Sequence, residues 1–239
     1  MNRPFAAFDI DGTLIRWQLY HAIADQLAKE GHIDQEAYKT MKDARKAWKR
    51  RTESSFRDYE VLVISTYEEV LQKLTFEQLD TAVESVFDEY KDQVYNYTRD
   101  LLETLKQQGY LLFAISGSQD EIVRKIAKYY GFDDYIGTVY ERSKHGFTGN
   151  KIVAAHFKDQ ALKTLTKKHG VSYKDSFAIG DSKSDVAMMK LVEQPIAFNP
   201  EESLFEHAKE HGWKIVLERK NMVYELESKD GQYQLVKTN

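Results

Sequence analysis

The chain contains no cysteine, and this absence removes three kinds of chemistry at once. Disulfide bonds, thiolate zinc sites and a cysteine nucleophile are all excluded. Long hydrophobic runs are also missing, because no stretch approaches the roughly 18 apolar residues of a membrane-spanning helix. The first residues lack the charged and then apolar segments of a secretory signal. We therefore expect a cytoplasmic protein without stable membrane association.

An excess of positive charge is absent as well. The chain has 34 lysine and arginine residues against 38 aspartate and glutamate residues, a formal net charge of −4. A general nucleic-acid binder normally has a basic domain, so we expect a small soluble partner and no nucleic acid. Hydrophobic residues make up 42% of the 239 residues. This content predicts one large α/β domain, or such a core with an insertion.

One stretch near the start of the chain carries the strongest signal. Residues 5–8 form a short apolar run typical of a strand buried on both faces, and an Asp/Gly/Thr cluster follows it. Asp9 and Asp11 are two residues apart, so their side chains are expected on the same side, at the carboxyl end of the strand. Open α/β sheets bind ligands at that edge. One acid can then attack a substrate or hold a metal while the other transfers protons.

A calcium-binding loop and a purely structural turn are the alternatives for this stretch. The calcium loop fails on spacing, because Gly12 comes too early after Asp11 and no Glu stands at the twelfth position. A chance Asp-x-Asp-Gly-Thr has a frequency of about 10⁻⁵ to 10⁻⁶ per position. We therefore interpret the stretch as a functional site.

A helical pattern follows Thr13 and continues to about Tyr97, and the next apolar run typical of a strand is at residues 111–115. This order predicts a helical insertion that forms a cap over the site. The core domain would contain residues 1–15 and 98–239, and the cap residues 16–97. A basic segment at residues 42–51 surrounds Trp48. We interpret it as a solvated helix face, with an acidic substrate or an anionic membrane as the alternative partner.

Strands and helices alternate in the rest of the chain. Helical patterns cover residues 119–130, 158–169, 185–191 and 203–210, and strand patterns cover residues 176–179, 196–198 and 214–217. A polar, glycine-containing stretch without a strand pattern runs to Gly149, and a β-hairpin pattern surrounds Asp230 and Gly231 at residues 223–236. The alternation predicts a three-layer, Rossmann-like α/β fold with a parallel sheet and a C-terminal β-hairpin.

Two further strand ends carry polar clusters. Ser116, Gly117 and Ser118 follow residues 111–115, and a hydroxyl with backbone N–H groups at a helix start predicts an anion site, ordinary turn residues being the alternative. Asp181 and Asp185 follow residues 176–179 and would lie at the same edge as Asp9. Oxygen ligands without His or Cys favour Mg²⁺. Helix capping by Asp185 is a compatible alternative.

Carboxylates that face a phosphate need a cation besides the metal, because each close pair of like charges costs about 4 kcal/mol at 4 Å. Lys158, at the start of a helix, is the candidate, and Lys151 and Lys163 are lesser ones. His207 and His211 stand four residues apart but lack the Glu of a zinc-protease helix and a third ligand. We therefore predict no metal site at these histidines.

These residues, taken in order, resemble the four motifs of the haloacid dehalogenase (HAD) superfamily. The resemblance spans about residues 5–217, and the layout is similar to subfamily IB, which contains phosphoserine phosphatase. The helical insertion looks like the type I cap of that subfamily. The resemblance implies a Mg²⁺-dependent phosphomonoesterase that acts on a small phosphorylated metabolite through an aspartyl-phosphate intermediate. The motifs are Asp9-Ile10-Asp11-Gly12-Thr13, Ser116, Lys158 and Gly180-Asp181-Ser182-Lys183-Ser184-Asp185.

The resemblance also implies a role for each residue. Asp9 would be the nucleophile, and Asp11 would protonate the leaving alcohol and then activate water. Mg²⁺ would be held by Asp9, the backbone carbonyl of Asp11 and Asp181, with Asp185 orienting a metal-bound water. Ser116 and Lys158 would bind the transferring phosphoryl oxygens. The substrate-binding residues would be Thr13, Gly117, Ser118, Trp17 and Gln18.

Three positions depart from phosphoserine phosphatases. Gln18 stands where those enzymes carry Glu, and Val63 stands where they carry the Arg of the cap, so phosphoserine is disfavoured as the substrate. Ser184 replaces their Asn. At the start of the cap, Trp17, Gln18 and Tyr20 are expected near the leaving group, although the two aromatic residues could instead pack the cap's own core. A phosphate-ligand-binding regulatory protein and a phosphomutase are the alternative functions.

Overall fold

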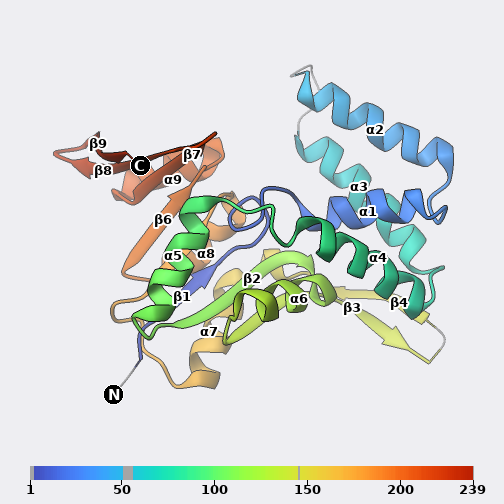
Figure 1. Cartoon of the computed structure of the whole chain (residues 1–239), viewed down its shortest axis with the longest axis horizontal. Helices are drawn as coiled ribbons and strands as arrows, with labels where there is room; N and C mark the ends of the chain where they lie inside the picture. The colour runs from blue at the N-terminus through green and yellow to red at the C-terminus, as the bar shows by residue number, and fades with distance from the viewer. Residues whose placement is uncertain (1–2, 51–55, 145, 239) are drawn as a thin grey trace. The chain divides into compact units, whose positions relative to one another are not determined.

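The structure, a computed structural model, describes residues 3–50, 56–144 and 146–238 (Figure 1). The chain divides into two compact units. The core unit contains Met1–Gln18, Tyr90–Thr138 and Val153–Asn239, and the helical unit contains Leu19–Glu89 and Val139–Ile152.

A mostly parallel sheet runs through the core unit. Its strand order is β3-β2-β1-β5-β6-β7-β8-β9, with parallel pairing from β3 to β7 and antiparallel pairing from β7 to β9. The short strand β1 is therefore central, between β2 and β5. The strands are β1 (Phe5–Phe8), β2 (Leu111–Gln119), β3 (Asp134–Ser143), β5 (Phe177–Gly180), β6 (Gln194–Phe198), β7 (Lys214–Arg219), β8 (Met222–Lys229) and β9 (Gln232–Thr238).

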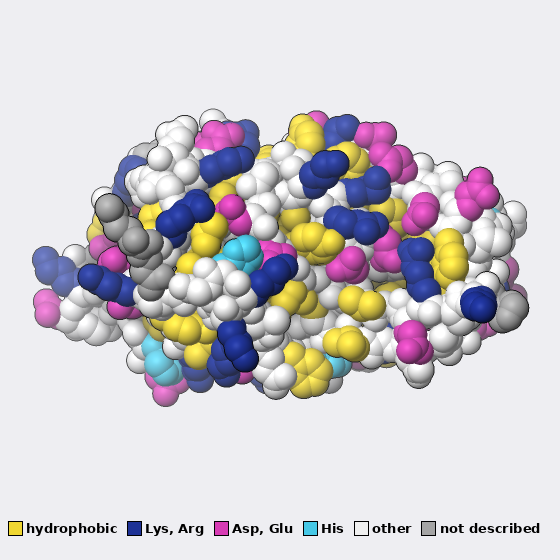
Figure 2. Space-filling view, turned by 90° about the horizontal axis from the view of Figure 1, so that it is seen from below, with side chains coloured by type: hydrophobic (Ala, Val, Ile, Leu, Met, Phe, Trp, Pro, Cys, Tyr) yellow, Lys and Arg dark blue, Asp and Glu magenta, His cyan; other side chains and the backbone are white. Residues whose placement is uncertain are grey.

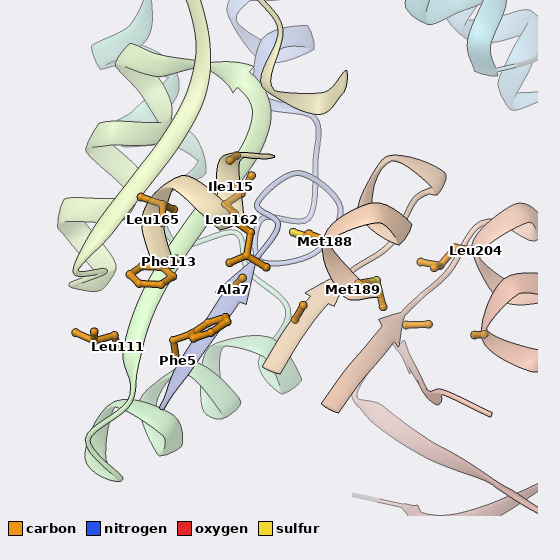
Figure 3. Close-up of a cluster of buried hydrophobic side chains, with 14 of the residues drawn as sticks. Phe5, Ala7, Leu111, Phe113, Ile115, Leu162, Leu165, Met188, Met189 and Leu204 are labelled. Carbon is orange, nitrogen blue, oxygen red and sulfur yellow. The ribbon is translucent and has the colours of Figure 1, made fainter. Parts of the chain in front are cut away.

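Helices cover both faces of this sheet. On one face, Phe5 and Ala7 of β1 and Phe113 of β2 form a buried cluster with residues of α7, α8 and α9 (Figure 3). On the other face, Tyr97 of α5 stacks on Phe198 of β6 with ring centroids 5.9 Å apart. The alternation of side chains along a strand produces these two apolar faces. The helices are α5 (Asn96–Gln107), α6 (Asp120–Tyr130), α7 (Lys158–His169), α8 (Val186–Met189) and α9 (Glu202–His211), with 3₁₀ turns η1 (Ala154–His156) and η2 (Lys183–Asp185).

The fold class predicted from the sequence is confirmed. The parallel sheet between helical layers, the helical insertion after the first strand and the C-terminal hairpin of β8 and β9 are all present. Such a sheet is specified by short apolar strands that alternate with amphipathic helices, and this alternation was readable in the sequence.

The prediction that residues 131–149 lack strands is wrong. The second half of β3 pairs with β4 (Gly146–Ile152) in an antiparallel hairpin, and residues 139–152 belong to the helical unit. This hairpin contains few buried side chains, among them Phe147, so it lacks the apolar run by which strands are recognised. The unit boundaries fall after Gln18 and Glu89, whereas we expected domain boundaries after residues 15 and 97.

Four helices form most of the described part of the helical unit, and two partly buried members of the basic segment 42–51 make contacts within it, whereas Lys42, Lys46, Lys49 and Arg50 are exposed. Arg45 forms a salt bridge with Asp25 at 2.8 Å and donates a hydrogen bond to Tyr59, and Trp48 stacks on the Tyr59 ring. These two members of the segment therefore stabilise the unit itself, while Arg51 lies outside the described residues. The helices are α1 (Leu19–Lys29), α2 (Gln35–Lys49), α3 (Phe56–Leu71) and α4 (Phe76–Tyr90).

Among the described residues, no helix has both the length and the apolar character that crossing a membrane requires. On the face seen in Figure 2, Lys and Arg side chains are interspersed with Asp and Glu side chains.

The buried His21 of α1 generates a prediction about pH. It is fully buried against the rings of Tyr20 and Tyr59. Burial, with a contribution from the charge of Arg45, lowers the pKa of His21 from 6.5 to about 3. Between these values the unfolded chain binds a proton that the folded chain excludes. We therefore expect the free energy of unfolding to decrease as the pH falls through this window, by at most about 1.4 kcal/mol per pH unit from this residue.

Chemical denaturation at several pH values, with wild type and His21→Gln, measures this effect. In His21→Gln, the free energy of unfolding should depend less on pH between about 3 and 6.5, because the unfolded variant has no imidazole at this position to bind the proton. Identical slopes for the two proteins would contradict the assignment.

Candidate active site

The central strand β1 leads directly into a tight turn that carries the first two acids. The Asp9 N–H donates to the Ile179 carbonyl of β5 at 2.9 Å, and the chain then turns through Gly12, whose φ is +76°. A Cβ atom at Gly12 would lie 2.2 Å from Oδ2 of Asp181. Glycine is therefore needed both for the left-handed backbone and for the close approach of the turn to Asp181.

Three carboxylates and one lysine meet at this edge of the sheet. Asp9, Asp181 and Asp185 each offer an oxygen within 4.8 Å of the others. Lys158, in the first turn of α7, places its Nζ 2.6 Å from Oδ1 of Asp9 and 2.5 Å from Oδ1 of Asp185. Asp9, Asp185 and Lys158 are all buried. The fold thus brings Asp9 close to Asp181 and Asp185, which follow it by 172 and 176 residues in the sequence.

The two other candidate lysines are engaged elsewhere. Lys151 forms a salt bridge with Glu68 inside the helical unit. Lys163 forms an exposed salt bridge with Asp159, one turn earlier on α7, at 2.8 Å. Of the three candidates, Lys158 alone contacts the acidic cluster.

The electrostatics of the cluster follow from its burial. Burial raises the pKa of Asp9 to about 7, although the neighbouring Lys158 lowers it. Burial also raises the pKa of Asp181, and the charges of Asp9 and Asp185 add to this effect. For Lys158, burial acts to lower the pKa, but Asp185 and Asp9 raise it above its ordinary value. The lysine therefore stays charged, and a further cation would stabilise the ionised acids.

Asp185 caps the turn η2, as the helix-capping interpretation of the sequence predicted. Its Oδ2 accepts hydrogen bonds from the Asp181 N–H at 3.2 Å, the Ser182 N–H at 3.0 Å and the Ser182 hydroxyl at 3.0 Å. A Cβ atom at Gly180 would lie 2.3 Å from Cγ of Asp185. Because Oδ1 binds Lys158, both oxygens of Asp185 are occupied by protein groups.

Asp11 lies among hydroxyl groups. The Ser116 hydroxyl donates to Oδ2 of Asp11 at 2.6 Å, and the Ser118 hydroxyl donates to Oδ1 at 3.0 Å. These two serines continue strand β2, which extends to Gln119, and α6 begins only at Asp120. They therefore stand directly before the helix, as expected, although the strand that carries them is longer than the predicted residues 111–115. The strand shows a register shift against β3 in this region, between Ile115 and Gln119.

Thr13 and Gly117, which were also predicted to lie around the phosphate, make contacts within the core unit. The Thr13 hydroxyl donates to Oδ2 of Asp9 at 3.2 Å, which places Thr13 directly beside the expected nucleophile. Gly117 packs against Ala155, where a Cβ atom would approach to 3.0 Å, and its carbonyl accepts from the Thr138 hydroxyl at 2.7 Å. Close packing is thus sufficient reason for a glycine at position 117.

Residues expected near the leaving group fall in both units. Trp17 and Gln18 are partly buried at the end of the first core segment, and the Trp17 carbonyl lies 3.3 Å from the Gly12 N–H that donates to it. In the helical unit, the Tyr20 hydroxyl donates to Glu60 at 2.7 Å, which supports the alternative that Tyr20 packs within that unit. Val63 is fully buried in α3.

Sequence reasoning missed the loop that supports Asp181. The Glu201 N–H donates to the Asp181 carbonyl at 2.8 Å, and Oε1 of Glu201 accepts from the Lys183 N–H at 2.7 Å. Asn199, with a φ of +41°, accepts the Glu218 N–H on its side-chain oxygen at 2.8 Å. The stretch from Ala197 to Pro200 resembles less characterised members of the subfamily, but its Asn-Pro pair is typical of any turn and did not predict these contacts.

Comparison with known proteins gave consistent results. The model of the family of haloacid dehalogenase-like hydrolases matches residues 6–190. A histidinol-phosphatase of Neisseria meningitidis is 28% identical over 228 residues, which cover 90% of this chain and 98% of the relative. A phosphoserine phosphatase of Methanocaldococcus jannaschii is 26% identical over 210 residues, which cover 87% of this chain and 90% of the relative. These homologues are, by name, phosphoric monoester hydrolases.

A solved structure shows the same fold. The phospho-aspartyl intermediate analogue of a phosphoserine phosphatase superposes with a TM-score of 0.62 at 20% identity, and the match covers 92% of this chain and 95% of that one.

The close approach of Gly12 to Asp181 generates a prediction with a matched control. Gly12→Ala and Gly109→Ala both place alanine at a positive φ, +76° and +84°, so each introduces about 1–2 kcal/mol of backbone strain. Only at Gly12 does the new Cβ displace the Asp181 carboxylate, since nothing lies within 4 Å at Gly109. We expect Mg²⁺ to raise the thermal midpoint of wild type and Gly109→Ala but not of Gly12→Ala. An equal rise in both variants would contradict a role for the Asp181 position in holding the metal.

Proposed function

The chain belongs to the haloacid dehalogenase-like hydrolase family, and we propose that it is a Mg²⁺-dependent phosphomonoesterase that acts on a small phosphorylated metabolite through an aspartyl-phosphate. The observation that carries this proposal is the different surroundings of the two acids in the first turn. Asp9 contacts the charged Lys158, whereas Asp11 accepts hydrogen bonds from the hydroxyl groups of Ser116 and Ser118. Relatives named as phosphatases support the phosphoester as the bond that is cleaved.

The surroundings of the two acids favour a division of labour. Burial raises the pKa of Asp9, and the contact with Lys158 acts against this effect by favouring the ionised form, which is the form that attacks phosphorus. A carboxyl group that contacts neutral hydroxyls can carry a proton and release it. Asp9 is therefore our nucleophile and Asp11 our general acid and base, the assignment that the family resemblance also implies.

The proposed reaction has two steps. In the first, an oxygen of Asp9 bonds to phosphorus, the bond from phosphorus to the ester oxygen breaks, and Asp11 donates its proton to the departing alcohol. In the second, Asp11 removes a proton from water, the water oxygen bonds to phosphorus, and the bond to Asp9 breaks. Inorganic phosphate is released, and both acids return to their starting states.

The donor set of the cluster fits Mg²⁺. Asp9 and Asp181 present carboxylate oxygens within 4.8 Å, and no His or Cys belongs to the group. Hard oxygen ligands of this kind suit Mg²⁺. We propose Asp9, Asp181 and the Asp11 carbonyl as its protein ligands, with Asp185 orienting the Asp181 loop and a metal-bound water. When bound, Mg²⁺ would offset phosphate charge and stabilise the charge that develops during transfer.

On the phosphate side, Ser116 and Lys158 are proposed to bind the transferring oxygens. The Nζ of Lys158 lies 2.6 Å from Oδ1 of Asp9, so the oxygens of a phosphoryl group bonded to Asp9 would lie within reach of Lys158. The Thr13 hydroxyl, 3.2 Å from the other oxygen of Asp9, would hold the attacking carboxylate in a fixed orientation. Fixed donors of this kind stabilise developing charge without reorganisation during the reaction.

The substrate is proposed to be an amino-alcohol phosphate without a carboxylate, such as histidinol phosphate. Val63 replaces the Arg expected in phosphoserine phosphatases and is fully buried, so it offers no charge to a substrate carboxylate. The histidinol-phosphatase relative matches 90% of this chain and 98% of its own length. In histidinol phosphate, the carboxyl group of the amino acid is replaced by a primary alcohol that carries the phosphate.

A substrate panel tests the proposed function. Purified protein with Mg²⁺ should release phosphate from histidinol phosphate faster than from phosphoserine, sugar phosphates or an aryl phosphate. Failure to hydrolyse any member of the panel would overturn the proposal. Transfer of phosphate to a sugar would instead establish a phosphomutase, and tight phosphate binding without turnover would favour the regulatory alternative.

The two acids predict different mutant phenotypes. Asp9→Asn should abolish hydrolysis of every substrate, because the nucleophile is lost. Asp11→Asn should slow alkyl phosphates much more than an aryl phosphate, whose leaving group needs little protonation; general acid catalysis contributes about 10²–10⁴-fold. Steady-state rates on the two substrate types measure the difference. Equal losses on both types would exclude Asp11 as the general acid.

Gln18 is the predicted specificity residue on the core side. It follows the turn of Asp9 and Asp11 closely and is partly buried. We expect Gln18→Ala to change kcat/KM unevenly among the phosphoesters while Mg²⁺ affinity stays nearly constant. A uniform effect on all substrates, or no effect, would show that another part of the chain selects the leaving group.

A further inference from the structure

A second group of side chains with the ligand atoms to hold a metal ion lies on α9, the helix beside β7 (Figure 1). His207, Glu210 and His211 each offer one ligand atom, and these atoms lie within 4.8 Å of one another. Residues three and four apart are neighbours on a helix surface, which explains why the three side chains meet. From the sequence we expected no metal here because a third ligand was missing. Glu210 supplies that ligand.

The His211 ring already has the tautomer that a metal ligand requires. Its Nδ1 lies 3.0 Å from the His207 carbonyl oxygen, and since that oxygen can only accept, Nδ1 carries the proton. The lone pair is therefore on Nε2, the other ring nitrogen. Histidines that bind metals almost always donate their second ring N–H to a carbonyl, a carboxylate or water. The Nδ1 contact thus provides the orienting hydrogen bond.

The His207 ring contains an unsatisfied nitrogen. Its Nε2 has less than 1 Å² of accessible surface and has no hydrogen-bond partner among the described parts of the chain. The rings of His207 and His211 stack with centroids 4.1 Å apart, and Trp213 packs against them at 4.9 and 5.7 Å. Aromatic packing therefore holds both imidazoles in place, and a metal ion would provide the partner that the buried nitrogen lacks.

We propose that His207, Glu210 and His211 form a binding site for a transition-metal ion, with Zn²⁺ as its first candidate. Imidazole ligands suit Zn²⁺, Cu²⁺ and Ni²⁺, whereas Mg²⁺ prefers oxygen ligands alone. Two imidazoles and a carboxylate are a known zinc donor set, and three protein ligands leave the fourth tetrahedral position open. The site shares no residue with the acidic cluster of Asp9, so it is a second ion site.

One neighbouring charge opposes this site and makes it testable. The positive charge of Lys190 acts on His207, and it would repel a bound cation. Lys190→Gln should therefore strengthen Zn²⁺ binding, whereas removal of a ligand should weaken it. If Zn²⁺ bound elsewhere, Lys190→Gln and the removal of a ligand would not change its affinity in opposite directions.

The experiment is a calorimetric titration of the full chain with Zn²⁺ in excess Mg²⁺, repeated with Co²⁺ to record its visible absorption. We expect one site in wild type. His211→Gln, which alters an exposed side chain at the end of the helix, should weaken binding by more than tenfold, and Glu210→Gln should also weaken it. His32→Ala, which removes a histidine of the helical unit, should leave binding unchanged.

Three results would overturn the proposal. The first is Zn²⁺ affinity that is unchanged in His211→Gln. The second is affinity that falls equally in His32→Ala. The third is affinity that is lost in Asp9→Asn but retained in His211→Gln, which would place the ion at the acidic cluster. Because the readout is binding, failure here leaves the proposed phosphatase activity untouched.

Discussion

The buried contact of Lys158 with Asp9 and Asp185 is the interaction on which the rest of the active-site edge depends. Removing three ions from water is costly, and their mutual attraction offsets the cost only when the geometry is tight. Here the distances are 2.6 and 2.5 Å, and each acid has further donors: Thr13 for Asp9, and the backbone and hydroxyl of Ser182 for Asp185. Loss of one partner from such a group typically costs about 3–5 kcal/mol. The end of β1, the start of α7 and the turn η2 are therefore held in one arrangement by charge.

Two glycines make this arrangement sterically possible. Gly12 leaves room for the Asp181 carboxylate and Gly180 leaves room for the Asp185 carboxylate, with distances to a hypothetical Cβ of 2.2 and 2.3 Å. Each glycine stands next to an acid of the active site in the sequence, since Gly12 follows Asp11 and Gly180 precedes Asp181. The motif thus combines charge with the absence of a side chain. At Gly12 the missing side chain lets an acid from the opposite loop approach, and at Gly180 it lets an acid from the same loop approach.

How far the sequence predicted the structure depended on the range of the interactions. The buried strand of Phe5 and the turn of Gly12 have strong local patterns, and they were found. Lys158 was identified from the need for a cation among acids, and it does contact Asp9. The strand β4 was missed because its pairing with β3 rests on backbone hydrogen bonds with few buried side chains. Glu201 was missed because its partner Asp181 is remote in sequence and the bond is made by the backbone.

The hairpin of β3 and β4 has a consequence for how this protein can be recombined with its relatives. The helical unit is built from two separate stretches, residues 19–89 and 139–152. Glu68 of the first stretch contacts both Tyr140 and Lys151 of the second. Exchange of residues 19–89 alone for the equivalent insert of a homologue would leave these hairpin side chains opposite foreign partners. A functional chimera therefore needs four crossover points instead of two, so that both stretches are exchanged together.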